Sequence, residues 1–236
     1  MQAIWTLIKR ELSAQFNSVV AYIVVILFLL ITGGMFFLDF FEGIQELSLR
    51  RFFGDAPFFL AFFAPAMSMS VFSEEKRAGT LELLMTMPVS DLQIVIGKFI
   101  GVVLLLAVVL LFTLPYPITL YFLGDLDWGP VIGGYLGLLF LGAAYLSVGV
   151  MVSSWTKNQI VAILLAFFLC FVLFIIDRLL GVQSGNTATI LETMSANYHF
   201  RSISRGVIDL RDLVYYVSVM VICLAAARTS LAARRW

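Results

Sequence analysis

Long apolar runs alternate with short polar segments along this chain of 236 residues. The runs cover residues 19–38, 56–72, 94–123, 131–152, 159–177 and 213–232. A helix of ~20 apolar residues crosses the ~30 Å hydrocarbon core of a bilayer. The pattern therefore predicts an all-α integral membrane protein with six transmembrane helices, built as a single domain over residues 1–236.

Prolines indicate where two of these spans depart from a straight helix. The run 94–123 is longer than a bilayer requires. We therefore expect it to begin in the cytosol near Asp91 and to bend at Pro115 and Pro117. The second run contains Pro65, where we expect a kink or break.

Residues 1–17 carry a mixed pattern that differs from the spans. The apolar positions are Ile4, Trp5, Ile8, Leu12 and Phe16. Lys9, Arg10 and Glu11 lie among them and would be costly in hydrocarbon. We therefore expect an amphipathic interface helix that lies flat at the membrane surface, marked by Trp5 and these three charged residues. The first span that follows lacks a cleavage site behind it, so we expect it to stay attached as a signal anchor.

The polar segment 73–93 has the pattern of a short, separate helix. Its apolar stripe comprises Leu81, Leu84 and Met85. Thr80 is the expected N-cap, and Pro88 ends the helix. Ser90 and Gln93 fit a capping box that opens the third span. A helix of about seven residues is marginal alone in water, so either the N-terminal helix or a partner protein must cover its apolar side.

Charged residues precede this short helix. They are Glu74, Glu75, Lys76 and Arg77. Two interpretations are compatible with them, a solvated cluster at the membrane edge or a contact for a cytosolic machine. The break at Gly79 and Thr80 and the second capped helix favour the contact, because a solvated edge needs neither.

Segment 178–212 scatters apolar residues through a polar frame and is not a plain loop. Gly206 follows Arg205 in the manner of a helix stop. We expect two short helices that dip back toward the membrane on the outer side as a re-entrant hairpin. The alternative is a surface hairpin that only caps the bundle. We expect His199 in this segment to make a hydrogen bond at a helix end.

Basic residues near the span ends indicate the orientation. Loop 124–130 has two acids and no Lys or Arg, whereas the loops on the opposite side hold Lys76, Arg77 and Lys157, and Arg234 and Arg235 follow the last span. Both termini are therefore expected in the cytosol. The longer outer segments also contain arginines, although acids outnumber them.

Composition agrees with a membrane protein and limits its chemistry. Hydrophobic residues make up 61% of the chain and charged residues 13%, against roughly 45–50% and 25% in soluble domains. The net charge is zero, so no basic field argues for nucleic acid. His199 is the single histidine, which argues against a multi-histidine metalloprotease, and we expect no metal or cofactor bound by this chain. Cys170 and Cys223 lie in apolar runs, where packing is favoured over a disulfide.

The chain lacks a device for binding ATP. Gly97-Lys98 misses both the first glycine and the hydroxyl residue of a P-loop. Few charges lie within the spans: Asp177 and Arg178 lie at an outer edge and Arg228 near an inner one. The sequence therefore shows no buried acid–base relay of the kind that a proton-coupled carrier needs. The pattern favours a pore whose energy arrives from outside the bilayer.

Two glycine pairs, Gly97 with Gly101 and Gly133 with Gly137, place small residues on one helix face. Such spacing permits close approach of helices, either within the chain or at a dimer seam.

The chain resembles the type-2 ABC exporter permeases, and within them the gliding-motility-type branch. The matching residues are Glu74-Glu75-Lys76-Arg77, Gly79 to Leu84, Thr86-Met87-Pro88-Val89-Ser90, Gln93, Gly97-Lys98, Lys9-Arg10-Glu11-Leu12 and the region Phe200 to Tyr216. The resemblance implies a six-span permease in which 1–17 is the interface helix, 73–93 the coupling loop on a cytosolic ATPase and 178–212 a pair of outer re-entrant helices. It implies ATPase-coupling roles for Glu74, Glu75, Lys76, Arg77, Gly79, Thr80, Leu81, Glu82, Leu84 and Pro88. The resemblance also assigns four residues to the outer re-entrant segment: His199, Arg201, Arg205 and Gly206.

These expectations combine into a permease subunit that is not an enzyme itself. Two cytosolic ATPase subunits would bind ATP and Mg, a second permease copy or paralogue would complete the pathway, and the complex would lie in a bacterial cytoplasmic membrane. The alternative is a non-transporting scaffold that relays ATPase motion to a periplasmic or membrane accessory protein. The sequence favours no particular substrate and leaves homodimer and heterodimer both open.

Overall fold

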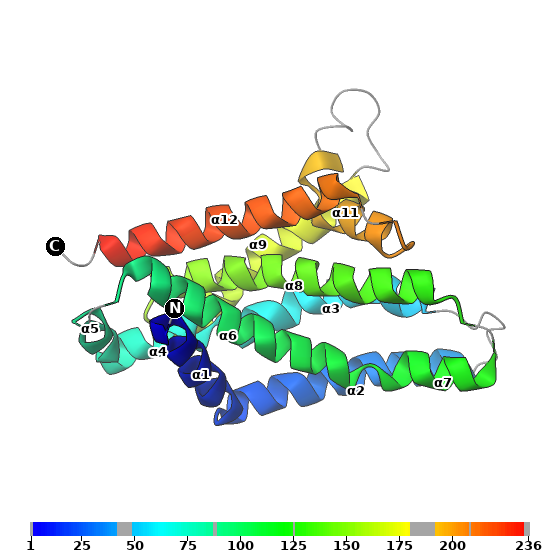
Figure 1. The fold of residues 1–236 in the computed structure, drawn as a ribbon, viewed down its shortest axis with the longest axis horizontal. Coiled ribbons are helices and arrows are strands. Elements are labelled where there is room, and N and C mark those ends of the chain that lie inside the picture. The colour runs from blue at the N-terminus through cyan, green and yellow to red at the C-terminus, as the bar shows by residue number, and fades with distance from the viewer. Residues whose placement is uncertain are drawn as a thin grey trace.

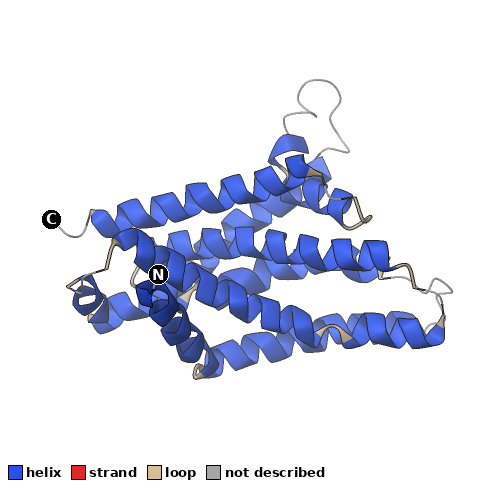
Figure 2. Cartoon of the chain, in the orientation of Figure 1, coloured by secondary structure: helices blue, strands red, loops and turns tan. Residues whose placement is uncertain are grey.

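The computed structural model describes residues 2–41, 49–86, 89–124, 126–179, 192–207 and 209–233. Within these segments the chain forms helices and short connections, with no strand (Figure 2). The helices are α1 Gln2–Phe16, α2 Val19–Phe41, α3 Arg50–Ser68, α4 Ser70–Ala78, α5 Thr80–Met85, α6 Asp91–Phe112, α7 Pro115–Leu123, α8 Trp128–Trp155, α9 Gln159–Leu179, α11 Ala196–Ile203 and α12 Leu210–Ala232. The all-α prediction is confirmed for the described residues.

Among the described residues, six helical stretches are long and apolar enough to cross a membrane, as the sequence predicts. They are Val19–Leu38, Arg50–Ala78, Asp91–Leu123, Trp128–Trp155, Gln159–Ile176 and Leu210–Ala232. The second stretch differs most from the expected 56–72, because it begins earlier and continues through α4. The charged residues 74–77 therefore belong to a helix that prolongs the second span, and the predicted loop begins only after Ala78.

Helix α8 is the central helix of the bundle, with α3, α6, α9 and α12 packed around it (Figure 1). In the most apolar stretch of the α8 span 78% of the residues are buried, whereas the buried share is 22% in the spans of α2, α9 and α12. Glycines let its neighbours approach: Phe53 of α3 packs against Gly134, and Leu106 of α6 against Gly142. Small residues are the usual means of close helix packing in membranes.

The prolines act differently in the two spans that contain them. Pro115 starts α7 after a two-residue break in the third span, as expected. Thr113, at the break, donates to the carbonyl of Leu110 at 2.7 Å and so occupies an acceptor at the end of α6. Of the kink or break expected at Pro65, the break is wrong: α3 continues through Pro65 to Ser68, and the interruption falls at Met69. A kink at Pro65 stays a prediction.

The bundle has two distinct ends (Figure 1). Helices α4 and α5 lie at one end, together with the start of α1 and the end of α12, and we call this the α5 end. Helix α11 lies at the other, the α11 end. The two ends of the chain thus point the same way, in agreement with an even number of spans.

Candidate functional site

Helix α4 carries the four consecutive charges 74–77 and sorts them between two faces. Lys76 is buried, and its ammonium donates to the carbonyl of Ser154 at the end of α8. Glu75 is partly buried, whereas Glu74 and Arg77 are exposed. Glu74 accepts a hydrogen bond from the amide of Gln159, the first residue of α9, at 3.4 Å. Of these four residues, Glu75 and Lys76 therefore take part in packing within the chain, whereas Glu74 and Arg77 face outward.

Gly79 makes the turn between α4 and α5. Its φ of +72° is left-handed, a conformation that glycine adopts without steric cost, and its N–H donates to the carbonyl of Glu75. The expectation that Thr80 caps α5 is wrong, because Gly79 holds the cap position and Thr80 is the first helical residue. The Thr80 hydroxyl instead donates back to the Glu75 carbonyl at 3.5 Å.

Helix α5 buries one side and exposes the other. Leu81 and Leu84 of the predicted stripe are buried in the apolar core of this chain, and the side chain of Met85 lies outside the described part. The chain itself thus covers the apolar side, with α4 as a packing neighbour. Glu82 and Leu83 are exposed. Pro88, expected to end this helix, lies outside the described residues, and the expected capping box of Ser90 and Gln93 is present at the start of α6.

A buried ion-pair cluster joins α1, α4 and α6 next to this site. The ammonium of Lys98, 4% exposed, lies 2.8 Å from Glu11 Oε2 and 3.0 Å from Glu75 Oε1, and it donates to the Val71 carbonyl at 2.8 Å. Arg10 reaches the same Oε1 of Glu75 at 2.9 Å. We call Arg10, Glu11, Glu75 and Lys98 the α1–α4–α6 cluster.

The cluster balances two carboxylates with two cations. Separating a buried pair leaves an uncompensated charge in a low-dielectric interior, which costs about 3–5 kcal/mol. The three helices are therefore coupled, because a displacement of α4 that breaks these contacts is expensive. The sequence prediction missed Lys98 as a buried charge. The available signal was a lysine inside an apolar run, which must find acidic partners nearby.

Helix α1 packs across α6 at an oblique angle (Figure 1). The contact is tight at Gly101, where an added Cβ would lie 2.8 Å from the side chain of Glu11. The glycine pair 97 and 101 thus serves packing within the chain at Gly101. Trp5 is exposed, and the Lys9 ammonium lies 5.3 Å from the centre of its ring. Whether this face lies in the membrane interface stays a prediction.

Helix α11 is anchored at the opposite end of the bundle. His199 is buried, with Nδ1 2.7 Å from Asp212 Oδ1 of α12 and its ring stacked on Tyr215 at 4.3 Å. The predicted hydrogen bond of His199 is confirmed, with Asp212 as the partner that the sequence did not identify. Gly206 follows α11 with a φ of +86°, as a helix stop requires. Residues 180–191 of the expected hairpin lie outside the described residues, and its re-entrant character stays a prediction.

The fold and this site define a class of protein. The described residues form six apolar spans, a short helix at one end of the bundle and a buried charge cluster beside that helix. These are features of a multi-pass membrane protein whose polar end helices are tied to its spans.

Comparison with known families identifies the chain more closely. Residues 5–222 match the model of the ABC-2 family transporter proteins, and the chain belongs to this family. No curated protein matches it. The family consists of transmembrane components of ABC transporters, which are not themselves catalytic and work with a cytosolic ATPase.

Proposed function

We propose that this chain is the permease subunit of an ATP-driven exporter and that α5 is its coupling helix, the contact for the ATPase. One observation carries the proposal: α5 exposes Glu82 and Leu83 while α4, directly before it, is joined to α1 and α6 by the α1–α4–α6 cluster. A push on the exposed helix would thereby reach two spans and the N-terminal helix.

The mechanism follows from these contacts. Closure of two ATPase subunits around ATP and Mg²⁺ displaces α5, and the backbone turn at Gly79 passes the displacement to α4. Because Lys98 bonds to both Glu11 and Glu75, α1 and α6 move with α4. The bundle then alternates between inward-facing and outward-facing states, and the substrate leaves the cytosol.

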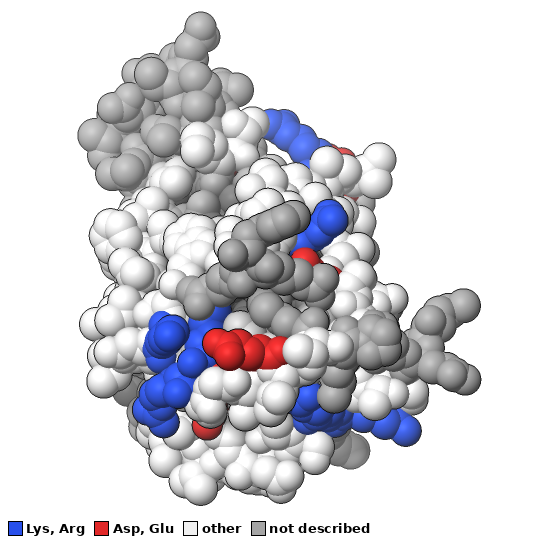
Figure 3. All heavy atoms as spheres, turned by 90° about the vertical axis from the view of Figure 1, so that its left-hand side faces the viewer, with Lys and Arg blue, Asp and Glu red and all other residues white. Residues whose placement is uncertain are grey.

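The assembly that we propose contains a second permease copy or a paralogue, in a bacterial cytoplasmic membrane with both termini in the cytosol. Charged side chains gather on the α5 end, as Figure 3 shows, which suits a surface that faces water and an ATPase. The sparsely buried spans of α2, α9 and α12 offer faces to lipid or to the second subunit. The likeness to the gliding-motility-type branch belongs to the same proposal.

The test compares two exposed leucines at the α5 end. Leu83 of α5 and Leu92 of α6 are 66% and 46% exposed. We expect Leu83→Glu to lower the recovery of the ATPase with the purified full chain in mild detergent by about tenfold, since an apolar contact would meet a buried charge. ATPase recovery is measured by quantitative mass spectrometry and by ATP hydrolysis in the eluate.

Leu92→Glu is the matched control and should leave ATPase recovery unchanged. Unfolding is excluded by the elution profile of each variant. Equal recovery with the native chain and with Leu83→Glu would show that α5 is not the contact.

The second candidate function is a membrane scaffold that does not transport a substrate and instead relays the motion of the ATPase to an accessory protein. It is favoured by Val207 and Leu210, which are 63% and 73% exposed where the chain turns from α11 into α12 and could contact an accessory membrane protein. Reconstitution of the chain and its ATPase in liposomes separates the two functions. ATP hydrolysis that responds to lipid or polymer substrates supports the exporter, and hydrolysis that responds only to an added partner supports the relay.

A further inference from the structure

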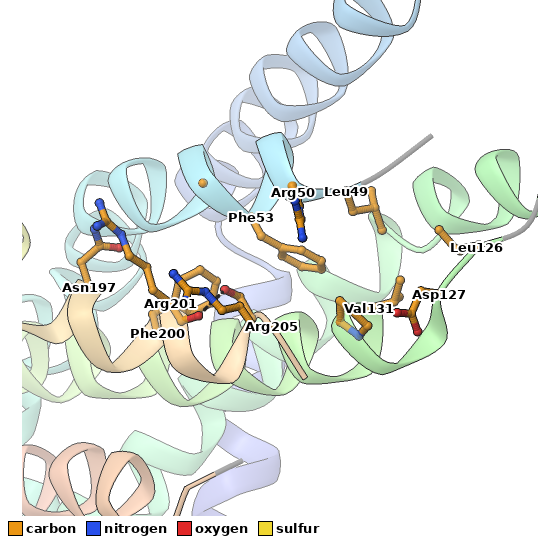
Figure 4. Close-up of a pocket in the computed structure, with 13 residues that line it drawn as sticks. Leu49, Arg50, Phe53, Leu126, Asp127, Val131, Asn197, Phe200, Arg201 and Arg205 are labelled. Atoms are coloured by element: carbon orange, nitrogen blue, oxygen red, sulfur yellow. Dashed lines mark hydrogen bonds between the residues drawn. The ribbon is translucent and has the colours of Figure 1, made fainter. Parts of the chain in front are cut away.

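A cavity of about 800 Å³ opens at the α11 end of the bundle, far from the α1–α4–α6 cluster. Its walls are the start of α3, the start of α8 and the side of α11, as Figure 4 shows. The volume falls within the roughly 300–1,000 Å³ of sites that hold small molecules. The cavity is thus large enough for a ligand.

The polar lining of this cavity is strongly basic. Arg50 comes from α3, whereas Arg201 and Arg205 come from α11 and the turn after it. The only carboxylate among the described lining residues is Asp127, whose Oδ1 already accepts from the N–H of Gly129 at 3.1 Å. Three guanidinium groups around one space favour an anion, and their planar donors match phosphate oxygens.

The rest of the lining is largely apolar. Phe53, Val131 and Phe200 line the cavity and are otherwise buried. Leu126 and Pro130 also line the cavity and are partly exposed. The lining therefore matches an amphipathic molecule, with an anionic head toward the arginines and an apolar part along Leu126 and Pro130.

Close packing holds the walls in place. An added Cβ at Gly133 of α8 would meet the carbonyl oxygen of Ile203, and one at Gly137 would lie 3.0 Å from the Phe200 ring. Helix α11 is thus pressed against α8, and the glycine pair 133 and 137 positions Phe200 in the cavity wall. On the other side of α11, the pair of His199 and Asp212 ties it to α12.

The cavity lies where the spans begin. Arg50 and Trp128 are the first residues of two candidate spans, and the Trp128 side chain is 45% exposed. Tryptophan is typical of the headgroup level of a bilayer. The arginines are therefore at the depth of lipid phosphates.

We propose that this cavity binds the phosphate headgroup of an anionic lipid, with Arg50, Arg201 and Arg205 as its ligands. The apolar part of the lipid lies along Leu126 and Pro130. The site goes beyond the proposed coupling function, because it involves neither the ATPase nor α5.

A tryptophan introduced into the lining by Leu126→Trp serves as the reporter of binding. Trp5, Trp128, Trp155 and Trp236 are replaced by Phe in the full chain, which is placed in phosphatidylcholine nanodiscs. Increasing fractions of brominated phosphatidylglycerol should quench the tryptophan of the Leu126→Trp variant at a lower lipid fraction than brominated phosphatidylcholine does. We expect Arg50→Gln or Arg205→Gln to raise the phosphatidylglycerol fraction at half-quenching by about fivefold each.

Matched controls lie next to the cavity. Arg51 and Arg211 are exposed arginines that are not among its lining residues. Arg51→Gln and Arg211→Gln should leave the half-quenching fraction unchanged. Arg50→Lys should retain more of the preference than Arg50→Gln, because it keeps the charge but loses the planar donors.

Two results would overturn the proposal. Equal quenching by the two brominated lipids in the reporter chain with Arg50, Arg201 and Arg205 intact would show that there is no anionic site. Full displacement of brominated phosphatidylglycerol by excess inorganic phosphate would assign the cavity to a free anion and not to a lipid. Neither result bears on ATPase recovery, so failure here is distinct from failure of the coupling proposal.

Discussion

A lysine inside a membrane span requires partners, and Lys98 has three. Its ammonium donates hydrogen bonds to Glu11 and to the carbonyl of Val71, and it forms an ion pair with Glu75. Arg10 adds a second cation at Glu75 from a position where its own side chain is 52% exposed. The energetic importance of the two cations should therefore differ strongly.

We expect Lys98→Met to lower the free energy of unfolding by about 3–5 kcal/mol, because Glu11 loses its cation in a buried site. Arg10→Gln should lower it by only ~0–1 kcal/mol, since an exposed pair is screened by water. Thermal unfolding of the purified chain in detergent, followed by circular dichroism, measures both.

The double variant Glu11→Gln with Lys98→Met separates charge from packing. It removes a cation and a carboxylate together and leaves Glu75 with Arg10. It should be more stable than Lys98→Met alone. If Lys98→Met is as stable as Arg10→Gln, the buried cluster does not hold the three helices together.

At the scale of elements, sequence patterns located the helices better than their junctions. The capping box at Ser90 was predictable because both of its hydrogen bonds are local. The cap of α5 was not, because Gly79 serves two helices at once, ending α4 and preceding α5. The second span extends through α4, where Lys76 contacts Ser154, a residue far away in sequence that no local pattern identifies.

Gly133 gives a prediction for the contact of α11 with α8. We expect Gly133→Ala to destabilise the chain by ~1–3 kcal/mol, because its Cβ would collide with backbone atoms that have little room to move. Loosening of α11 should also speed trypsin cleavage at the exposed Arg205. Thermal unfolding and timed proteolysis measure the two effects.

The control is Gly34→Ala in α2, where an added Cβ meets no atom within 4 Å among the described residues beyond its own helix backbone and chain neighbours. It should leave proteolysis at Arg205 unchanged and stabilise the helix by up to ~1 kcal/mol. Equal proteolysis of the two variants would show that the glycine contact does not fix α11.

For the whole molecule, the number of spans followed from the sequence, whereas the central position of α8 did not. Length and hydropathy define a span, but α6 and α9 are more apolar than α8 and yet less buried. Burial depends on the small residues that let neighbours approach, such as Gly134 and Gly142. Likewise, the cavity at the α11 end combines Arg50 with Arg201 and Arg205, which no local pattern connects.

The orientation of the bundle is the last prediction. Lys76, Arg77 and Lys157 lie at the α5 end, whereas the short loop 124–130 at the other end has no Lys or Arg, so the positive-inside rule, which is counted over short loops, predicts the α5 end in the cytosol. In a chain with Cys170→Ala and Cys223→Ala, we add Thr86→Cys at the α5 end or Val207→Cys at the α11 end, both at exposed positions. A maleimide that does not cross membranes should label the Val207→Cys variant in intact cells, and the Thr86→Cys variant only after the membrane is opened. The reverse pattern would place α5 outside the cell, where no cytosolic ATPase could reach it.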